Sequence, residues 1–234
     1  MKKTYISLLL AVVFCMVFSL EADAQSKRYK KKQQNRFNAG VVLGASLSQI
    51  DGDLYTGFNK IGIRGGLEGT IYLNKYFDVV AGLLYVQKGS RTNSNVTFAG
   101  DIPPNTEIKL DYMEVPFLLS VKLGSKSQTG YTLEAGFSYA RLINSQINAT
   151  EFPDKVSYSD LIDQFNSNEI NIIFGFNFLF SERFDVGILT EFQLNKLYKS
   201  SNTEDRGPIN SPGLPTIDFM RNYLIGIQFG YKFL

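Results

Sequence analysis

The sequence predicts an all-β fold: an eight-stranded antiparallel up-and-down transmembrane β-barrel that follows a cleaved signal peptide. Three observations lead to this prediction. Apolar side chains alternate with polar or small ones in eight segments, which is the period of a strand with one apolar face. The connections between these segments are alternately short and long. Aromatic side chains gather near the segment ends, as they do at membrane interfaces.

The N-terminal residues have the layout of a secretory signal. Two lysines precede a short apolar run, and an A-x-A cleavage site ends at Ala24. We therefore expect residues 1–24 to be a signal peptide that is removed, 25–36 to form a basic periplasmic tail and 37–234 to form the barrel. Cys15 lies in the apolar run after Val13-Phe14, which matches a lipoprotein box poorly, so no lipid anchor is expected.

Charge patterning says little about partners. The 24 basic and 22 acidic residues are mixed along the chain, except in "KRYKKKQQNR" at 27–36. This segment would bind anionic headgroups or cell-wall material, or would form a solvated tail, and we favour the tail. No other basic patch is present in the sequence, so nucleic acid is not an expected partner.

Each strand is predicted from its alternation. In the most hydrophobic stretch after the signal, Ile170, Phe174 and Phe178 share one face while Asn171 and Asn177 share the other. This stretch is also too short for a membrane helix, which needs about 20 apolar residues. The same period predicts strands over 37–47, 61–73, 77–87, 112–123, 131–142, 170–180, 184–196 and 219–233.

The connections predict the orientation of the barrel. Short turns are expected near 74–76, 124–130 and 181–183, and long polar loops near 49–60, 88–106, 143–168 and 197–218. Bacterial outer-membrane barrels have short periplasmic turns and long extracellular loops. We therefore expect a location in the cell outer membrane, with both termini in the periplasm.

A soluble lipocalin-like barrel would show the same alternation, and the polar face argues against it. Ten glycines lie on that face, where they suit a narrow lumen rather than a solvent-facing surface. They are Gly40, Gly44, Gly62, Gly66, Gly82, Gly136, Gly175, Gly187, Gly226 and Gly230. Charges on the apolar face occur only at strand ends, because a charge at mid-membrane would cost about 2–4 kcal/mol.

Two stretches carry a resemblance to a known family. "DGDLYTGFNKIGIRGGLEGTIYLNKYFDVVAGLLYVQKGS" followed by "LDYMEVPFLLSVKLG" resembles the PorT-like outer-membrane β-barrel proteins, often labelled "porin family". The similar parts are a Gly-rich first hairpin, the pattern LLYxQKG and the pattern LDYxEVPxLL. The resemblance implies an eight-stranded outer-membrane barrel. One founding member of that family is associated with protein secretion, but no feature assigns this chain to that role.

The polar face places charged residues inside the predicted barrel. Arg64, Glu68, Glu114, Glu134 and Glu191 are expected at middle heights. Nearer the periplasmic end we expect Asp78, Lys122, Asp185 and Lys232. Such a set would form a proton or cation site, paired hydrolytic carboxylates, or an ion-paired plug. We favour the plug, because side chains fill an eight-stranded lumen and buried charges must be paired.

The residue inventory argues against an enzyme. The chain has no histidine, and its single cysteine lies in the predicted signal, so thiol nucleophiles, Ser-His-Asp triads and ordinary zinc sites are not expected. Asp51-Gly52-Asp53 lacks the rest of an EF-hand and is expected to be a turn. We predict no catalytic, cofactor or metal site. The expected function is structural or partner-binding through the long loops; the alternatives are a small porin or an accessory barrel of a protein-secretion system.

Three cations are predicted at the extracellular rim. Arg141, Lys196 and Arg221 fall at outward strand ends on the lipid-facing phase. Guanidinium and ammonium groups there would contact lipopolysaccharide phosphates, unless the strands already extend into water. The other expected partners are outer-membrane lipid, the barrel-assembly machinery through the C-terminal strand, and a protein at the extracellular loops.

Overall fold

The computed structural model describes residues 36–51, 57–91, 107–123, 130–148, 165–197 and 220–233. The chain divides into two units, 1–35 and 36–234, and every described residue belongs to the second. The predicted signal peptide, and the predicted tail except Arg36, lie outside the described residues.

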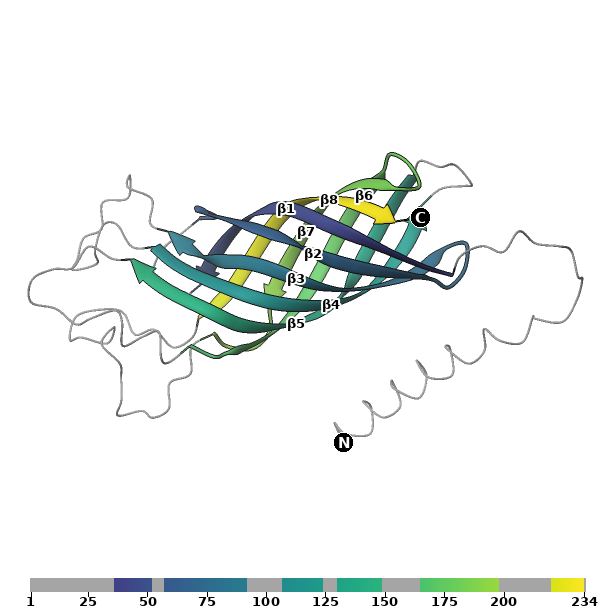
Figure 1. The fold of residues 1–234 in the computed structure, drawn as a ribbon. Helices are drawn as coiled ribbons and strands as arrows, with labels where there is room; N and C mark the ends of the chain where they lie inside the picture. The colour runs from purple at the N-terminus through teal and green to yellow at the C-terminus, as the bar shows by residue number, and fades with distance from the viewer. Residues whose placement is uncertain are drawn as a thin grey trace, which may run out of the picture. The chain divides into compact units, whose positions relative to one another are not determined.

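The second unit is a closed barrel in which each strand pairs antiparallel with the next and β8 pairs with β1 (Figure 1). This confirms the predicted fold class. Among the described residues, no helix is long and apolar enough to cross a membrane. The strands are β1 (Phe37–Asp51), β2 (Lys60–Tyr72), β3 (Phe77–Arg91), β4 (Glu107–Leu123), β5 (Gly130–Asn148), β6 (Asn168–Leu179), β7 (Phe184–Gln193) and β8 (Arg221–Phe233).

The two ends of the barrel differ in their connections. The turn end, on the right in Figure 1, is joined by residues 73–76, 124–129 and 180–183. At the first of these, the Asn74 side chain accepts hydrogen bonds from the backbone N–H groups of Tyr76 and Phe77 at 2.8 and 2.9 Å, the side-chain capping that Asn supplies in tight turns. The loop end is joined by the longer segments 52–59, 92–106, 149–167 and 194–220.

Several strands extend farther toward the loop end than the alternation predicts. Residues 88–91 and 143–148 were expected in loops but belong to β3 and β5, and β4 begins at Glu107 rather than at 112. By contrast, β7 ends at Gln193 instead of 196. A strand needs about 9–11 residues to cross a membrane, so part of the 17-residue β4 and of the 19-residue β5 lies beyond the bilayer. Apart from Ile143, the outer face of that part is polar, and this is why apolar alternation did not reveal it.

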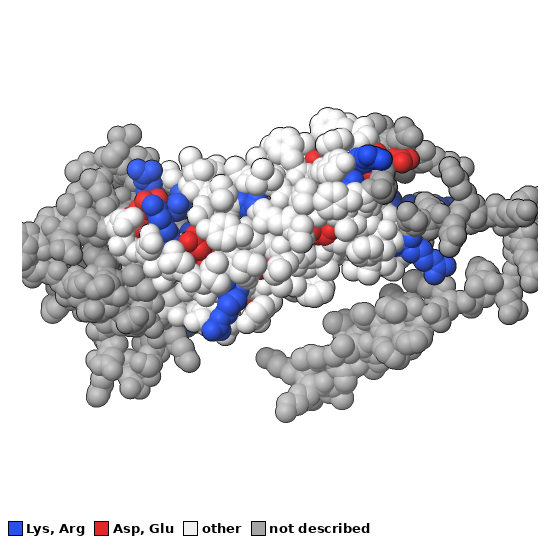
Figure 2. All heavy atoms as spheres, viewed as in Figure 1, with Lys and Arg blue, Asp and Glu red and all other residues white. Residues whose placement is uncertain are grey.

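The outer face is apolar and exposed along the middle of the barrel. Leu43, Leu67, Phe117, Phe137 and Phe229 are examples, each 57–68% exposed. The face seen in Figure 2 is mostly uncharged, and Lys and Arg gather toward its two ends. A surface of this size that is apolar and uncovered is suited to lipid rather than to water.

Aromatic side chains form contacts on the outer face near the turn end. Tyr131 packs against Phe176 and Phe178 with ring centroids 5.5 and 5.1 Å apart, and Tyr231 packs against Phe184 and Phe233 at 4.9 and 5.6 Å. Aromatic rings at this level are typical of the girdle at a membrane interface.

A β-bulge interrupts the pairing of β4 with β5. Tyr112 pairs with Leu142 but Asp111 pairs with Asn144, so Ile143 has no partner in β4. Because the side-chain period of a strand is two, one extra residue exchanges the faces of all that follow. Ile147 therefore turns to the inner face, opposite Ile108.

The inward-facing glycines allow close approach between neighbouring strands. A Cβ atom on Gly82 would lie 2.8 Å from the Leu67 carbonyl oxygen, and one on Gly136 would lie 2.9 Å from the Leu118 Cα atom. Both distances are shorter than a carbon atom tolerates. Gly89 is a separate case, because its φ of +138° lies in a region that side chains disfavour.

Candidate functional site: the barrel interior

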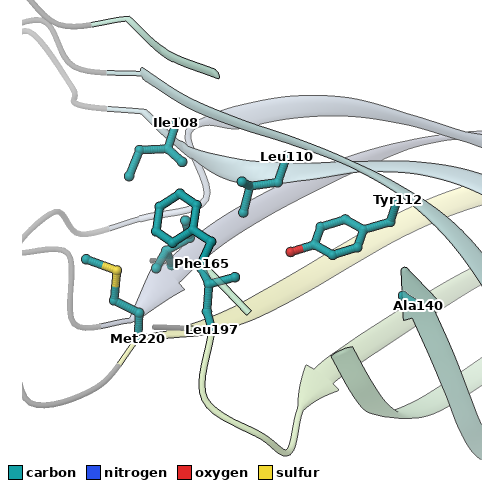
Figure 3. Close-up of a cluster of buried hydrophobic side chains, with 8 residues drawn as sticks. Ile108, Leu110, Tyr112, Ala140, Phe165, Leu197 and Met220 are labelled. Carbon is teal, nitrogen blue, oxygen red and sulfur yellow. The ribbon is translucent and has the colours of Figure 1, made fainter. Parts of the chain in front are cut away.

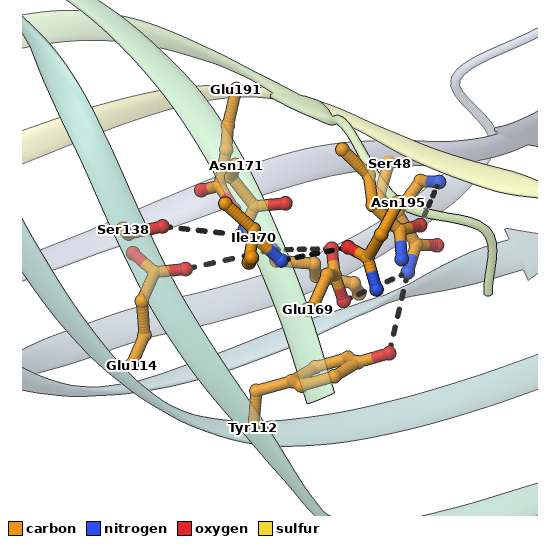
Figure 4. A network of polar contacts seen from close by, with 12 residues as sticks. Ser48, Tyr112, Glu114, Ser138, Glu169, Ile170, Asn171, Glu191 and Asn195 are labelled. Carbon is orange, nitrogen blue, oxygen red and sulfur yellow. Dashed lines mark hydrogen bonds and ion pairs between the residues drawn. The ribbon is translucent and has the colours of Figure 1, made fainter. Parts of the chain in front are cut away.

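Five charged side chains meet inside the barrel and form what we call the inner charge network. They come from five different strands, so only the closed barrel brings them together. Figure 4 shows the three carboxylates among them, Glu114, Glu169 and Glu191. Each side chain is at most 3% exposed. The members are Arg64 of β2, Lys88 of β3, Glu114 of β4, Glu169 of β6 and Glu191 of β7.

Arg64 joins two of the carboxylates. Its Nη1 atom lies 2.7 Å from Glu114 Oε1 and 3.4 Å from Glu191 Oε2. Lys88 contacts all three: its Nζ atom lies 3.1 Å from Glu169 Oε1 and 3.5 Å from Glu114 Oε2, and it donates a hydrogen bond to Glu191. Glu114 and Glu191 therefore bridge the two cations. Because every ion has a partner of opposite sign, the network meets the requirement that buried charges be paired.

Neutral polar groups extend the network toward β8. Asn222 donates from Nδ2 to Glu169 Oε2 at 3.3 Å and to the Tyr112 hydroxyl at 3.4 Å. The Lys88 ammonium also lies 5.2 Å from the centre of the Tyr112 ring, a cation–π distance. These contacts fix the orientation of Glu169, whose ion-pair partner is Lys88.

The structure separates the five predicted mid-barrel charges. Arg64, Glu114 and Glu191 belong to the network, whereas Glu68 and Glu134 take part in none of the ion pairs between described residues. Glu68 and Glu134 are partly exposed although they lie on the inner face. The prediction of one plug containing all five residues was therefore too broad.

The four charges predicted nearer the turn end form two pairs. Lys122 Nζ lies 2.8 Å from Asp78 Oδ2, and Lys232 Nζ lies 3.4 Å from Asp185 Oδ2. The lysine side chains are 31% and 24% exposed. These pairs are far more accessible than the inner charge network.

Sequence reasoning missed Lys88 and Glu169. The predicted third strand stopped at 87 and the sixth began at 170, one residue short in each case. Continuing the same alternation by one position places both side chains on the inner face. The LLYxQKG and LDYxEVPxLL patterns gave a second signal, because Lys88 of the first contacts Tyr112 and Glu114 of the second.

The same two patterns also meet on the outer face. Gln87 donates from Nε2 to the Tyr85 hydroxyl at 2.9 Å and to Asp111 Oδ1 at 3.1 Å, and Asn144 donates to Asp111 Oδ2 at 2.9 Å. The patterns therefore describe a pair of adjacent strands that recognise each other through both faces.

An apolar cluster closes the interior at the loop end (Figure 3). On the inner face of β4, the side chains Glu114, Tyr112, Leu110 and Ile108 follow one another toward the loop end, so the charges give way to apolar groups. Each member of the cluster is at most 7% exposed. The members are Ile50, Ile108, Leu110, Tyr112, Ala140, Phe165, Leu197 and Met220.

The three predicted rim cations lie at the loop end on separate strands. Arg141 of β5 is exposed, and its Nη1 atom donates to Asn168 Oδ1 at 2.7 Å. Lys196 is exposed and follows the end of β7, and Arg221 is half-buried at the start of β8, paired in register with Asp51. No ion pair between described residues joins Arg141 or Lys196 to an acid.

Within the described ranges, no group of three or more His, Cys, Asp or Glu side chains is placed to hold a metal ion. Asp51, the one described residue of the Asp51-Gly52-Asp53 motif, ends β1; the other two lie outside the described residues.

The closed barrel, its exposed apolar belt and its aromatic contacts define an integral β-barrel membrane protein. The sequence of residues 23–199 matches the family described as outer membrane protein beta-barrel domain. The chain belongs to this family, and it is an integral outer-membrane β-barrel with a buried salt-bridge network in its lumen. No curated protein matches the sequence.

Several solved structures are similar in fold at low sequence identity. The attachment invasion locus protein Ail of Yersinia pestis is 14% identical with a TM-score of 0.40, over 84% of this chain and 98% of that chain. Neisserial surface protein A is 10% identical with a TM-score of 0.43, over 83% and 97%. OprG from Pseudomonas aeruginosa is 12% identical with a TM-score of 0.38, over 84% and 94%.

Proposed function

We propose that this protein is a non-enzymatic outer-membrane barrel whose lumen does not conduct and whose loop end binds a partner. The inner charge network is the observation that carries the proposal. It spans the lumen from β2 through β3, β4 and β6 to β7, and the apolar cluster lies beyond it toward the loop end. An ion crossing the barrel would have to separate buried ion pairs and then enter an apolar layer, and both steps are costly.

Conductance in planar lipid bilayers tests the closed lumen. We expect the purified full chain to insert without producing stable current steps, whereas a small porin would give them. An Arg64→Ala, Lys88→Ala double variant provides the comparison, because it removes both cations of the network. Stable open channels in the unmodified protein would contradict the proposal and favour the porin alternative.

The partner-binding part of the proposal rests on the loop end. Four long connections meet there, and β3, β4 and β5 run 15, 17 and 19 residues, which is more than a membrane crossing needs. Connections held by a rigid scaffold commonly carry binding. We propose that the loop end is extracellular, that both termini lie in the periplasm and that the loop-end partner is a protein.

We further propose that the chain belongs among PorT-like proteins. The contacts between the two sequence patterns support this placement. Lys88 of one pattern forms an ion pair with Glu114 of the other, so the two patterns would be expected to occur together in one chain. A role as accessory barrel of a secretion system is the second candidate. The C-terminal strand, with Phe229, Tyr231 and Phe233 on one face, supports recognition by the barrel-assembly machinery.

The rim cations support a lipid partner. Arg141, Lys196 and Arg221 lie at the loop end of the barrel, where outer-leaflet phosphates would be within reach if that end is extracellular. Asn168 holds the Arg141 guanidinium group in place, and a guanidinium group matches phosphate oxygens well. We propose that these three residues contact lipopolysaccharide phosphates.

A further inference from the structure

Charged side chains on the inner face differ in exposure between the turn end and the inner charge network. At the turn end, the Lys122 and Lys232 side chains are 31% and 24% exposed. Glu68 and Glu134, farther in, are still partly exposed. Within the inner charge network, however, every side chain is at most 3% exposed. We call the region of these partly exposed charged side chains the accessible part of the lumen, although neighbours on the inner face such as Val80 are buried.

Glycines provide the room in this accessible part. Glu68 pairs in register with Gly82, and Glu134 pairs with Gly175. A Cβ atom on Gly82 would lie 3.1 Å from Glu68 Cγ, and one on Gly175 would lie 3.5 Å from Glu134 Oε2. Side chains at these two positions would occupy the space into which the carboxyl groups extend. This gives the inward glycines a role besides strand packing.

The accessible part also has a surplus of negative charge. Lys122 neutralises Asp78, and Lys232 neutralises Asp185. Glu68 and Glu134 then remain without an ion-pair partner among the described residues, although the charges of Glu134 and Arg64 act on Glu68, and those of Asp185 and Lys232 act on both. With all six groups ionised, the formal balance of these side chains would be two negative charges.

An unpaired buried acceptor lies in the same place. Asn177 is 5% exposed and is one of the groups beside the Glu134 carboxyl. Its amide donates to the Thr132 hydroxyl at 3.3 Å, but its oxygen Oδ1 has no hydrogen-bond partner among the described residues. A buried acceptor without a donor is unfavourable, so this oxygen favours a ligand that donates hydrogen bonds or carries positive charge.

We propose that the turn-end half of the lumen is a blind vestibule that takes up small cations. The vestibule is lined by Glu68, Asp78, Lys122, Glu134, Asp185 and Lys232, and it ends at the inner charge network. Its ligands are hydrated inorganic cations or small alkylammonium ions, because the surplus acids attract positive charge without forming a coordination sphere. The proposal that the vestibule is closed at its inner end depends on the non-conducting lumen proposed above. The proposed preference for cations does not depend on it.

Cysteine accessibility tests the vestibule. Cys15 is the chain's only cysteine, so a Cys15→Ser background permits single labels. Glu134→Cys and Ala140→Cys both lie on the inner face of β5, on opposite sides of the boundary. With a methanethiosulfonate bearing a trimethylammonium group, we expect rapid modification at position 134 and protection at position 140. A heat-dependent gel shift shows first that each variant is folded, and Glu68→Cys provides a second accessible position.

Charge preference is measured with a matched anionic reagent. At each position we take the ratio of the modification rate with the trimethylammonium reagent to the rate with its sulfonate counterpart. This ratio should be several-fold higher at Glu134→Cys than at Glu182→Cys, an exposed position in a turn. Adding Glu68→Gln to Glu134→Cys should lower that preference.

Each result has a distinct meaning. Protection of both Glu134→Cys and Glu68→Cys would refute the vestibule but leave the closed lumen standing. Equal modification at 134 and 140 would refute the blind end, and with it the non-conducting barrel. Equal reagent preference at 134 and 182 would refute cation uptake alone.

Discussion

At the scale of single residues, Lys88 has the largest number of charged contacts in the interior. It meets Glu114, Glu169 and Glu191 while 1% of its side chain is exposed. Without it, Arg64 would be the one cation among the described residues in contact with the carboxyl groups of the network. Removing one partner from a buried ion pair is strongly destabilising, because the remaining charge is left without compensation.

We expect Lys88→Met to destabilise the barrel by about 3–5 kcal/mol. Methionine retains much of the side-chain length, so the loss comes mainly from the charge. Lys122→Met is the comparison: the Lys122 side chain is 31% exposed, although that of its partner Asp78 is 6% exposed, so a smaller loss is expected from this partly solvated pair. The chain has no tryptophan, so urea unfolding is followed by circular dichroism and gel mobility. Equal shifts of the two midpoints would show that the network is not a stabilising unit.

The residue scale also shows what sequence can and cannot supply. Alternation placed Arg64, Glu114 and Glu191 on the inner face, because face depends only on odd or even position. Which charges meet depends instead on the stagger between strands. Glu114 forms an ion pair with Arg64 from two strands away, whereas Glu68, on the same strand as Arg64, forms no ion pair with it. Lys88 and Glu169 were missed because the predicted third strand ended at 87 and the predicted sixth strand began at 170.

At the scale of elements, β3, β4 and β5 set the loop end apart. Their extra length was not predictable from alternation, because a strand beyond the bilayer no longer needs an apolar outer face. Arg141 marks the transition on β5. It lies after the exposed apolar residues Phe137 and Tyr139 and before a stretch that ends at Asn148 and whose outer face is mostly polar.

We predict that replacing Arg141, Lys196 and Arg221 together by Gln lowers the amount of lipopolysaccharide that purifies with the protein. Glutamine keeps hydrogen-bonding capacity but loses the charge that favours phosphate. A Lys75→Gln, Arg183→Gln variant is the control, because both residues are exposed and lie in turns at the opposite end. Undiminished lipid in the triple variant would remove support for the proposed contact.

At the scale of the whole molecule, the barrel is asymmetric along its axis. The turn end has short connections, aromatic contacts on the outside and accessible ion pairs on the inside. The loop end has long connections and a buried apolar interior. The proposed orientation, with the loop end outside, rests on this difference in connection length.

Orientation is tested with epitopes inserted in the connections. We expect an epitope within 198–219 to bind antibody on intact cells, and one within 124–129 to bind only after the outer membrane is opened. Both variants must first show heat-dependent gel mobility, which establishes that the barrel is folded. Antibody binding to the 124–129 epitope on intact cells would place the turn end outside and reverse the proposed orientation.

Because Ile143 has no partner in β4, the inward-facing residues of β5 are even-numbered before it and odd-numbered after it. Up to residue 142, even-numbered side chains face inward, but Ser145 and Ile147 are inward because the numbering has gained one residue relative to β4. A spin label at position 147 would therefore report on the interior, although odd positions from 131 to 141 report on lipid. By contrast, deleting one residue between 142 and 145 would remove the bulge and leave Ile147 facing inward, whereas deleting two would turn it to the outer face.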